Sequence, residues 1–224
     1  MDTLKSKITE IRVNKRFRLN RSSIFLDGLF AFSLDNEVIQ KEKLKVGQML
    51  SAEEVKRLTG FDRFERCYNS ALVFLGYRPR SEAEVRLRLQ KNKYAEAEIE
   101  SVIARLKSSG LLNDTAFAEF WTENRINFKP RGQRMLKSEL RNKGVEAGII
   151  TGAVEGIDEL ENARRAAAAK CRTLAVTDYQ VFKNKLGGYL QRRGFDYGVI
   201  SKIVKEAWKD RNGENVSDSE EISL

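Results

Sequence analysis

Histidine is absent from all 224 residues of the chain. Its absence excludes histidine-based acid–base catalysis, Ser-His and Cys-His nucleophile pairs, and most transition-metal sites. Cysteine is nearly as scarce: Cys67 and Cys171 are far apart and match no metal-binding spacing, so we expect both to be reduced core residues. We also expect no cofactor, because the chain lacks both a G-x-G-x-x-G motif and a glycine-rich loop followed by Lys-Ser/Thr.

Long hydrophobic runs are missing too. The longest apolar stretch, around residues 24–34, is interrupted by Asp27 and is too short to span a bilayer. The N-terminal sequence MDTLKSKITEIRV lacks the apolar core of a signal peptide. We therefore expect no membrane partner and a cytoplasmic location. The chain contains only 2 prolines and is 41% hydrophobic, a composition that argues for folded domains rather than disorder.

Positive charge is what the chain has in excess. It carries 41 Lys and Arg against 32 Asp and Glu, for a net charge of +9. The segment 212–224 contains four acidic residues and no basic one, so the net charge rises from +9 for the chain to +13 for its first 211 residues. We interpret this segment as an acidic disordered tail. The basic remainder would suit a nucleic acid, an acidic protein groove or an anionic membrane.

An internal repeat organises the folded part. Shifting the sequence by 51 positions places Ser81–Leu106 on Gly132–Ile157 without a gap, and a further shift of 50 brings a third segment into register. The same apolar positions recur each time: Val85, Leu136 and Leu186; Leu89, Leu140 and Leu190; Tyr94, Val145 and Phe195; Ile99, Ile150 and Ile200; Ile103, Val154 and Val204. Repeats of this period are typical of stacked supersecondary units, which present a long binding surface.

The predicted fold is mainly α, with three tandem three-helix repeats in an elongated curved array. The first 50 residues differ, because Ile8–Val13, Phe17–Leu19 and Ile24–Phe32 indicate three or four short strands with a hairpin turn at Asp27-Gly28. This small β-hairpin module would be marginal alone and needs something to pack against. The predicted domains are 1–50 for the β module, 51–110 for a lead-in helix and the first repeat, 111–157 and 158–211 for the second and third repeats, and 212–224 for the tail.

Capping signals set the predicted helix limits. Ser51 opens a capping box and a short helix that we expect to end at Gly60, with the next helix running from Asp62 to about Gly76. Ser81 opens a second capping box. Asp114, Asp158 and Thr177-Asp178 are predicted to cap later helices, and Pro130-Arg-Gly and Gly144 are predicted to end two others.

Three motifs occur in order along the helical part of the chain. The segment RPRSEAEV from Arg78 resembles the R-x-R-S-x-x-E-L signature that opens the first RecX repeat. GLLNDTAFA from Gly110 resembles that family's link motif, and KPRGQRMLKSELRNKG from Lys129 resembles its second-repeat signature. The resemblance covers about residues 62–208. The third repeat departs most, since the segment LGGYL from Leu186 lacks the glutamate of the E-L pair, and the β module matches an extension that only some members carry.

The resemblance implies an all-helical regulator rather than an enzyme. Such proteins bind the RecA recombinase, lie along the groove of its filament on single-stranded DNA, and inhibit or modulate its ATPase, strand exchange and co-protease activity in DNA repair and the SOS response. The implied partners are therefore the RecA filament and single-stranded DNA, with double-stranded DNA as a further candidate, and we expect a monomer.

Basic residues at the repeat turns and second helices are the candidate contacts. Arg134, Lys137 and Arg141 are three and four apart and so share a helix face opposite Leu136 and Leu140. A run this unbalanced repels itself, which favours a partner over a merely solvated face. The full set of candidate RecA- or DNA-binding residues is Arg78, Arg80, Lys129, Arg131, Arg134, Lys137, Arg141, Lys143, Lys183, Lys185, Arg192 and Arg193.

Two alternatives remain open at this stage. A plain sequence-nonspecific nucleic-acid-binding repeat protein fits the charge equally well, and it would bind free DNA with a steep salt dependence. A solvated turn, with the arginines folded back on Glu82 or Glu84, would explain Arg78 and Arg80 without any partner. The aromatic stripe of Phe117, Phe120 and Trp121 is best explained as core packing.

Overall fold

A computed structural model of the chain describes residues 5–14 and 20–212. The described residues form two compact units: one contains the chain up to Arg78 together with Val85–Leu111, and the other contains Pro79–Glu84 and the chain from Leu112 onward. The predicted strand at Phe17–Leu19 and the predicted tail lie outside the described residues, except that Asn212 ends the last helix.

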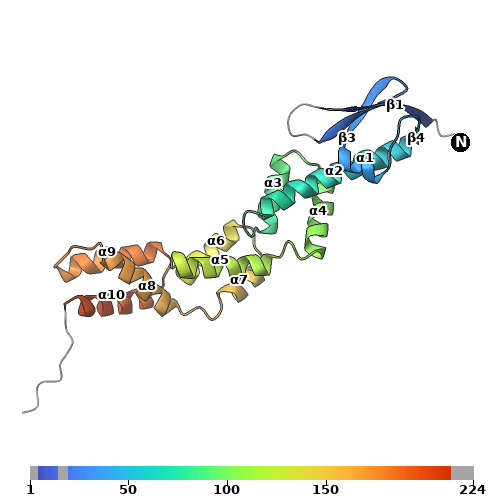
Figure 1. Cartoon of the computed structure of the whole chain (residues 1–224). Helices are drawn as coiled ribbons and strands as arrows, with labels where there is room; N and C mark the ends of the chain where they lie inside the picture. The colour runs from blue at the N-terminus through green and yellow to red at the C-terminus, as the bar shows by residue number, and fades with distance from the viewer. Residues whose placement is uncertain (1–4, 15–19, 213–224) are drawn as a thin grey trace, which may run out of the picture. The chain divides into compact units, whose positions relative to one another are not determined.

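The N-terminal module is an antiparallel sheet in the order β3-β2-β1-β4 (Figure 1). Its strands are β1 (Lys5–Val13), β2 (Arg21–Leu26), β3 (Leu29–Asp35) and β4 (Met49–Ser51). The hairpin turn at Asp27-Gly28 is confirmed, since both residues adopt positive φ angles of 49° and 83°, as a tight two-residue turn requires. The sequence missed the short helix α1 (Asn36–Lys41), which the Asp35 side chain caps by accepting from the Glu37 amide.

The sheet packs on α2 (Ala52–Leu75). This confirms the prediction that so small a sheet needs another element to pack against. Leu58 of α2 is buried together with Ile8, Ile24 and Leu34 of the sheet. The Ser51 capping box is present in both directions, with the Ser51 hydroxyl accepting from the Glu54 amide and the Glu54 carboxylate accepting from the Ser51 amide. Apolar burial and the cap together fix where α2 begins.

The predicted break in α2 is wrong, because a single helix runs through Gly60 without interruption. Gly60 is exposed, and a Cβ placed there would meet nothing within 4 Å, so the residue neither caps nor bends the helix. Asp62 is not a cap. It is buried, and its carboxylate accepts from the Arg21 guanidinium and the Asp35 amide. A glycine inside a helix only weakens it, and tertiary contacts decide whether the helix continues.

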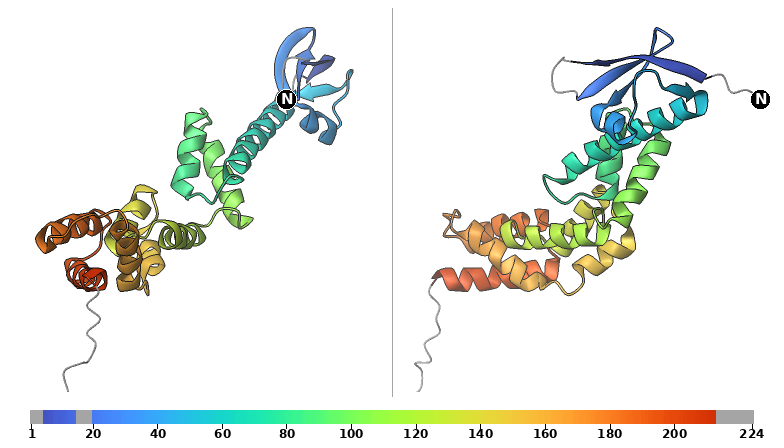
Figure 2. Two further views of the ribbon diagram at one scale, coloured as in Figure 1. Left: turned by 60° about the vertical axis from the view of Figure 1, so that its left-hand side comes forward. Right: turned by 45° about the vertical axis from the view of Figure 1, so that its right-hand side comes forward.

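Three three-helix repeats follow the sheet, as predicted. The first consists of α2, α3 (Glu82–Lys91) and α4 (Glu96–Ser108), and the second of α5 (Asp114–Phe128), α6 (Gln133–Asn142) and α7 (Ala147–Val154). The third repeat comprises α8 (Glu159–Cys171), α9 (Tyr179–Arg192) and α10 (Tyr197–Asn212), which pack on one another in pairs (Figure 2). Of the repeated apolar positions, all are buried except Tyr94, which is half-buried and donates its hydroxyl to the Arg66 carbonyl.

The helix limits follow the predicted caps with one shift. Asp158 and Asp178 cap α8 and α9, and Ser81 and Glu84 form the predicted capping box. Asp114, however, is the first residue of α5 rather than its cap. The cap is Asn113, whose side chain accepts from the Thr115 and Ala116 amides, and this frees Asp114 to accept from the Glu82 amide.

The turn after the second helix of each repeat is built alike. Lys93, Gly144 and Gly194 occupy equivalent positions and have φ angles of 63°, 74° and 83°. Glycine adopts this left-handed conformation freely, whereas a lysine is strained by it. The conformation therefore belongs to the repeat rather than to the residue type.

In the second unit, these turns also receive the starts of other helices. The Ser81 hydroxyl donates to the Lys143 carbonyl at 2.6 Å, and the Gly132 amide donates to the Arg193 carbonyl at 2.9 Å. Ser81 and Gly132 are equivalent positions, as are Lys143 and Arg193, so one type of interaction is used twice. A Cβ on Gly132 would overlap the Gly194 carbonyl, which explains glycine at this position.

Candidate nucleic-acid and protein interface

The basic stripe of α6 is free to act as an interface. Leu136 and Leu140 are fully buried beneath it, while Arg134 and Arg141 are exposed and Lys137 is half-exposed. Within the described part of the chain, none of these three basic side chains forms a hydrogen bond or an ion pair. Apart from the electrostatic attraction between Lys137 and Glu159, their charges are thus available to an outside partner.

Arg131 and Lys143, predicted as contacts, are instead tied to the protein. The Arg131 Nε lies 3.6 Å from a Glu139 carboxylate oxygen. The Lys143 Nζ lies 2.7 Å from the Glu84 carboxylate and 5.0 Å from the centre of the Trp121 ring. Both side chains are about a quarter exposed, at 26%. Their positions are explained by folding, so they are weaker candidates for binding a partner than the α6 stripe.

Glu139 is the centre of this internal network. Its carboxylate accepts from the Trp121 indole at 2.8 Å and from the Arg125 Nε at 2.7 Å. Arg125 also stacks on the Trp121 ring, with its guanidinium carbon 4.3 Å from the ring centre. Trp121 is therefore packed against the core with the buried Phe117, as predicted, but Phe120 is 37% exposed, so the prediction of a buried stripe is wrong for that residue.

The candidates of the third repeat divide in the same way. Lys183, Lys185 and Arg192 are exposed. Arg193 is half-buried: it donates to the Pro130 carbonyl at 3.0 Å and stacks on Tyr189 at 4.6 Å. Lys183, Lys185 and Arg192 are therefore accessible to a partner, while Arg193 stabilises the turn between α5 and α6 through its hydrogen bond to Pro130.

The remaining candidates lie at turns. Lys129 is exposed at the end of α5. Arg78 and Arg80, on either side of Pro79, are half-exposed and both take part in interactions within the protein. These interactions give the two arginines a role within the protein, and their contact with a partner stays a prediction.

A groove brings two of the candidates together. Arg134 of α6 and Lys183 of α9 line one hollow of about 430 Å³, although they belong to different repeats. Lys205 of α10 adds a third positive charge that sequence reasoning missed. The apolar part of the wall consists of Phe195, Ile200 and Val204. The exposed rings of Tyr179 and Tyr197 also line the groove.

Two glycines line this groove. Gly187 and Gly188 stand inside α9, where glycine costs about 1 kcal/mol per residue relative to alanine, and both line the groove. The pair of glycines inside a helical pattern was the available sequence signal for this part of the surface. A surface that combines cations, aromatic rings and apolar floor suits a single-stranded nucleic acid.

Glu159 of α8 contacts the start of α6 and has a raised pKa. Burial raises the pKa of Glu159, and the nearby Asp196 carboxylate raises it further. The Gln133 amide, which opens α6 and donates to Glu159 at 3.2 Å, opposes this shift, as does the charge of Lys137. Glu159 thus couples the third repeat to the start of the basic stripe.

Residues 5–14 and 20–212 contain no group of three or more His, Cys, Asp or Glu that could hold a metal ion. Burial raises the pKa of Cys67 to about 11, so this thiol stays protonated and unreactive. None of the helices described is long and apolar enough to cross a bilayer.

Comparison with known proteins assigns the whole arrangement to one family. Residues 6–51 match the regulatory protein RecX N-terminal domain, and residues 67–106, 113–154 and 157–204 match the first, second and third three-helix domains of RecX. Two relatives are both named regulatory protein RecX. The one from Oceanobacillus iheyensis is 32% identical, covering 89% of this chain and 76% of the relative. The one from Clostridium botulinum strain Alaska E43 is 33% identical, covering 90% and 96%.

Solved structures agree with the sequence matches. A crystal structure of regulatory protein RecX is similar with a TM-score of 0.66 at 25% identity, covering 89% of this chain and 99% of that one. A crystal structure of RecX from Lactobacillus salivarius gives 0.58 at 27% identity, over 65% and 97%. The sheet module and the three helical repeats occur in the same order as the matched domains, and the chain is therefore a member of the RecX family of regulatory proteins.

Proposed function

We propose that this chain binds the filament that RecA forms on single-stranded DNA and inhibits its ATPase, strand exchange and co-protease activity. Family membership supports a regulatory role in RecA-related processes. The observation that carries the finer proposal is the groove where Arg134 and Lys183, from successive repeats, line the same hollow with Tyr179 and Tyr197. One surface can then engage phosphates, bases and acidic protein groups together.

The test is RecA ATP hydrolysis on preformed single-stranded DNA filaments, titrated with this protein from far below the RecA concentration. Inhibition at substoichiometric levels is expected, because a filament-bound regulator affects many RecA subunits at once. Inhibition only when enough protein is present to coat the DNA would support the second candidate, a plain nucleic-acid-binding protein. The free basic stripe of α6 gives that candidate its support, and it predicts a steep fall of DNA affinity with salt.

The proposed binding residues are tested by a charge-reversal triple, Arg134→Glu, Lys137→Glu and Arg141→Glu. A matched control reverses Lys45, Lys56 and Arg172, which are exposed elsewhere. Reversing a charge that faces a phosphate or a carboxylate replaces attraction by repulsion, so the first triple should reduce filament affinity at least tenfold while the control changes it little. Equal reductions in both triples would show that net charge alone, rather than α6, determines binding.

A further inference from the structure

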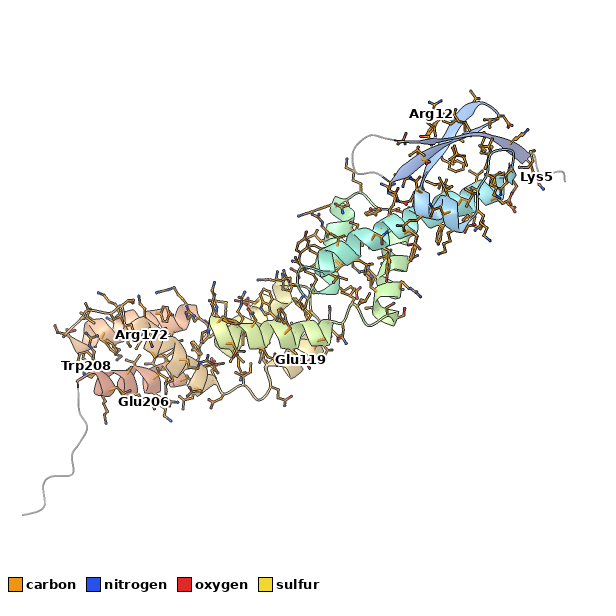
Figure 3. The ribbon with its side chains drawn as sticks, in the orientation of Figure 1. Lys5, Arg12, Glu119, Arg172, Glu206 and Trp208 are labelled. Carbon is orange, nitrogen blue, oxygen red and sulfur yellow. The ribbon has the colours of Figure 1, made fainter. Side chains whose placement is uncertain are left out.

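The second unit contains a cavity whose charge is opposite to that of the chain. It has a volume of about 410 Å³ and lies between α5, the end of α7 and the start of α8. Five carboxylates line it: Glu119, Glu123, Glu155, Asp158 and Glu161. Figure 3 labels Glu119 on α5. We call this hollow the acidic cavity.

Two of these carboxylates have a local explanation. Asp158 caps α8 by accepting from the Glu161 amide, and Glu161 forms an ion pair with Arg164 at 2.6 Å. Both stand at the start of a helix, where negative charge is favourable. The one basic residue of the wall, Arg165, donates to the Asn127 carbonyl at 3.3 Å.

The other three carboxylates are placed where they destabilise the free protein. Glu119 and Glu123 are four residues apart on α5, so their like charges are neighbours on one helix face. Glu155 is the C-cap of α7, the end of a helix that favours positive charge. Across the described ranges, no ion pair neutralises Glu119, Glu123 or Glu155. A positive group entering the cavity would relieve all three.

Unsatisfied polar groups in the wall are an independent sign of a missing occupant. Thr122 and Asn162 line the cavity and are only 4% and 3% exposed. Among the described residues, the Thr122 hydroxyl oxygen and the Asn162 amide nitrogen have no hydrogen-bond partner. The hydroxyl oxygen can accept from an incoming N–H group, whereas the Asn162 amide nitrogen is itself a donor and needs an acceptor. Buried polar groups are nearly always paired in native proteins, so an apolar residue would be expected at these positions unless something binds beside them.

The chemistry of the wall selects the occupant. The carboxylates do not gather tightly enough for a metal ion, since no such group occurs in residues 5–14 and 20–212. Nucleic-acid phosphates would be repelled. A guanidinium or ammonium group on a flexible stem fits the carboxylates and the Thr122 hydroxyl oxygen, because its N–H groups donate and these oxygens accept.

We propose that the acidic cavity receives an arginine or lysine side chain of a protein partner. Resting on the proposed function, the partner is the RecA protein of the filament rather than its DNA. The two surfaces then bind different parts of the filament. The basic α6 stripe binds DNA phosphates, and the acidic cavity binds the RecA protein. This assigns a protein-binding role to Glu119, Glu123 and Glu155. The net charge of +9 gives no indication of such an acidic site.

The first experiment is independent of RecA. The full-length protein, with its Thr122 backbone and Asn162 side-chain amides assigned by NMR, is titrated with a short arginine-rich peptide and, separately, with a glutamate-rich peptide of the same length. The arginine peptide should shift both resonances, and the triple Glu119→Gln, Glu123→Gln, Glu155→Gln should abolish the shifts. No shift at millimolar peptide would overturn the proposal. Equal shifts with spermidine at lower concentration would also overturn it, in favour of a polyamine site.

The second experiment compares binding to RecA filaments with binding to bare single-stranded DNA. The glutamine triple should bind filaments about tenfold or more weakly, as loss of buried charge pairs does at other interfaces, while its affinity for bare DNA stays equal or rises. The control triple Glu37→Gln, Glu53→Gln, Glu146→Gln should behave as wild type. Unchanged filament affinity in the cavity triple contradicts binding of the cavity to RecA. Failure of the wild type itself to prefer filaments contradicts the proposed function, while the peptide titration still decides the cavity.

Discussion

Arg21 and Asp62 form a two-pronged ion pair between the sheet and α2, with the Arg21 Nη1 3.0 Å from Asp62 Oδ1 and the Nη2 2.9 Å from Oδ2. Asp62 is buried and Arg21 is largely buried, with side-chain exposures of 4% and 14%. The Asp35 amide and the Ser33 carbonyl complete the network, so its charges are hydrogen-bonded on both sides. This pair makes α2 the support of the sheet rather than a separate lead-in.

Removing one partner of this pair should be costly. We expect Asp62→Ala to lower the free energy of unfolding of the first unit by about 3–5 kcal/mol, since it leaves the Arg21 charge buried and unpaired. Urea denaturation followed by circular dichroism measures this. Glu10→Ala, which breaks the exposed Glu10–Arg12 pair, is the matched control and should change stability little. An Asp62→Ala effect as small as the control's would show that the pair does not anchor the sheet.

Gly60 provides a test of the uninterrupted helix. Because it is exposed and helical, with open space where a Cβ would be, Gly60→Ala should stabilise the protein by about 0.5–1 kcal/mol. Thermal unfolding with a matching urea titration measures the change. Destabilisation would indicate that residue 60 is a helix end after all.

Gly132→Ala should have the opposite effect. Residue 132 has an ordinary φ angle of −73°, so alanine is tolerated by the backbone, but its Cβ would overlap the Gly194 carbonyl. Overpacking of this kind costs about 1–3 kcal/mol. Gly152→Ala is the control, since a Cβ there meets nothing within 4 Å and the residue lies inside α7. If both variants have the same stability in urea, Gly132 does not pack tightly on the turn after α9.

Glu159 predicts a specific dependence on pH. Its pKa is raised above the ordinary 4.5, chiefly by burial, so the folded state holds this proton more tightly than the unfolded state does. The favourable contribution is therefore present in full at low pH and is lost as the pH rises through the folded pKa. Glu159→Gln should be more stable than the wild type at pH 7, and the difference should vanish below the ordinary carboxyl pKa. A difference independent of pH in urea titrations would contradict this, and Glu53→Gln serves as the exposed control.

Cys67 should resist modification in the native protein. It is fully buried, and with a pKa of about 11 only about one thiol in a thousand is ionised at pH 8. In a Cys171→Ser variant, labelling with a thiol-reactive disulfide should proceed only at the rate of unfolding, and a Cys67→Ser variant should label faster through the half-buried Cys171. Labelling of native Cys67 at the rate of an unfolded peptide would show that its burial is transient.

The repeat and its core could be predicted from the sequence because they depend on local spacing. Fourteen of the fifteen repeated apolar positions are buried, and the caps at Ser51, Asp158 and Asp178 are where their residue types place them. The break at Gly60 failed because a glycine signals only a weak local preference, which the packing of α2 on the sheet outweighs.

The internal contacts of the candidate binding residues could be predicted less completely, since they depend on residues that are distant in the sequence. Lys143 pairs with Glu84, 59 residues away, and Arg193 with the Pro130 carbonyl, 63 residues away. Sequence spacing does not reveal contacts between residues so far apart, so the sequence indicated only an external partner for Lys143 and Arg193. The acidic cavity was missed for the same reason, because its carboxylates come from three helices whose charges look unremarkable one at a time.

The repeated interaction at Ser81 and Gly132 gives the second unit a direction. The segment Pro79–Glu84 rests on the end of α6, and the start of α6 rests on the end of α9, whereas α9 itself begins at an exposed Asp178. The start of the second helix in the first and second repeats therefore contacts the end of the second helix in the next repeat. Because a contact stabilises both of the elements it joins, loss of α9 should weaken the start of α6, and loss of α6 should weaken both of its neighbours. During synthesis, the Gly132 amide can gain its partner only after Arg193 has been added to the chain.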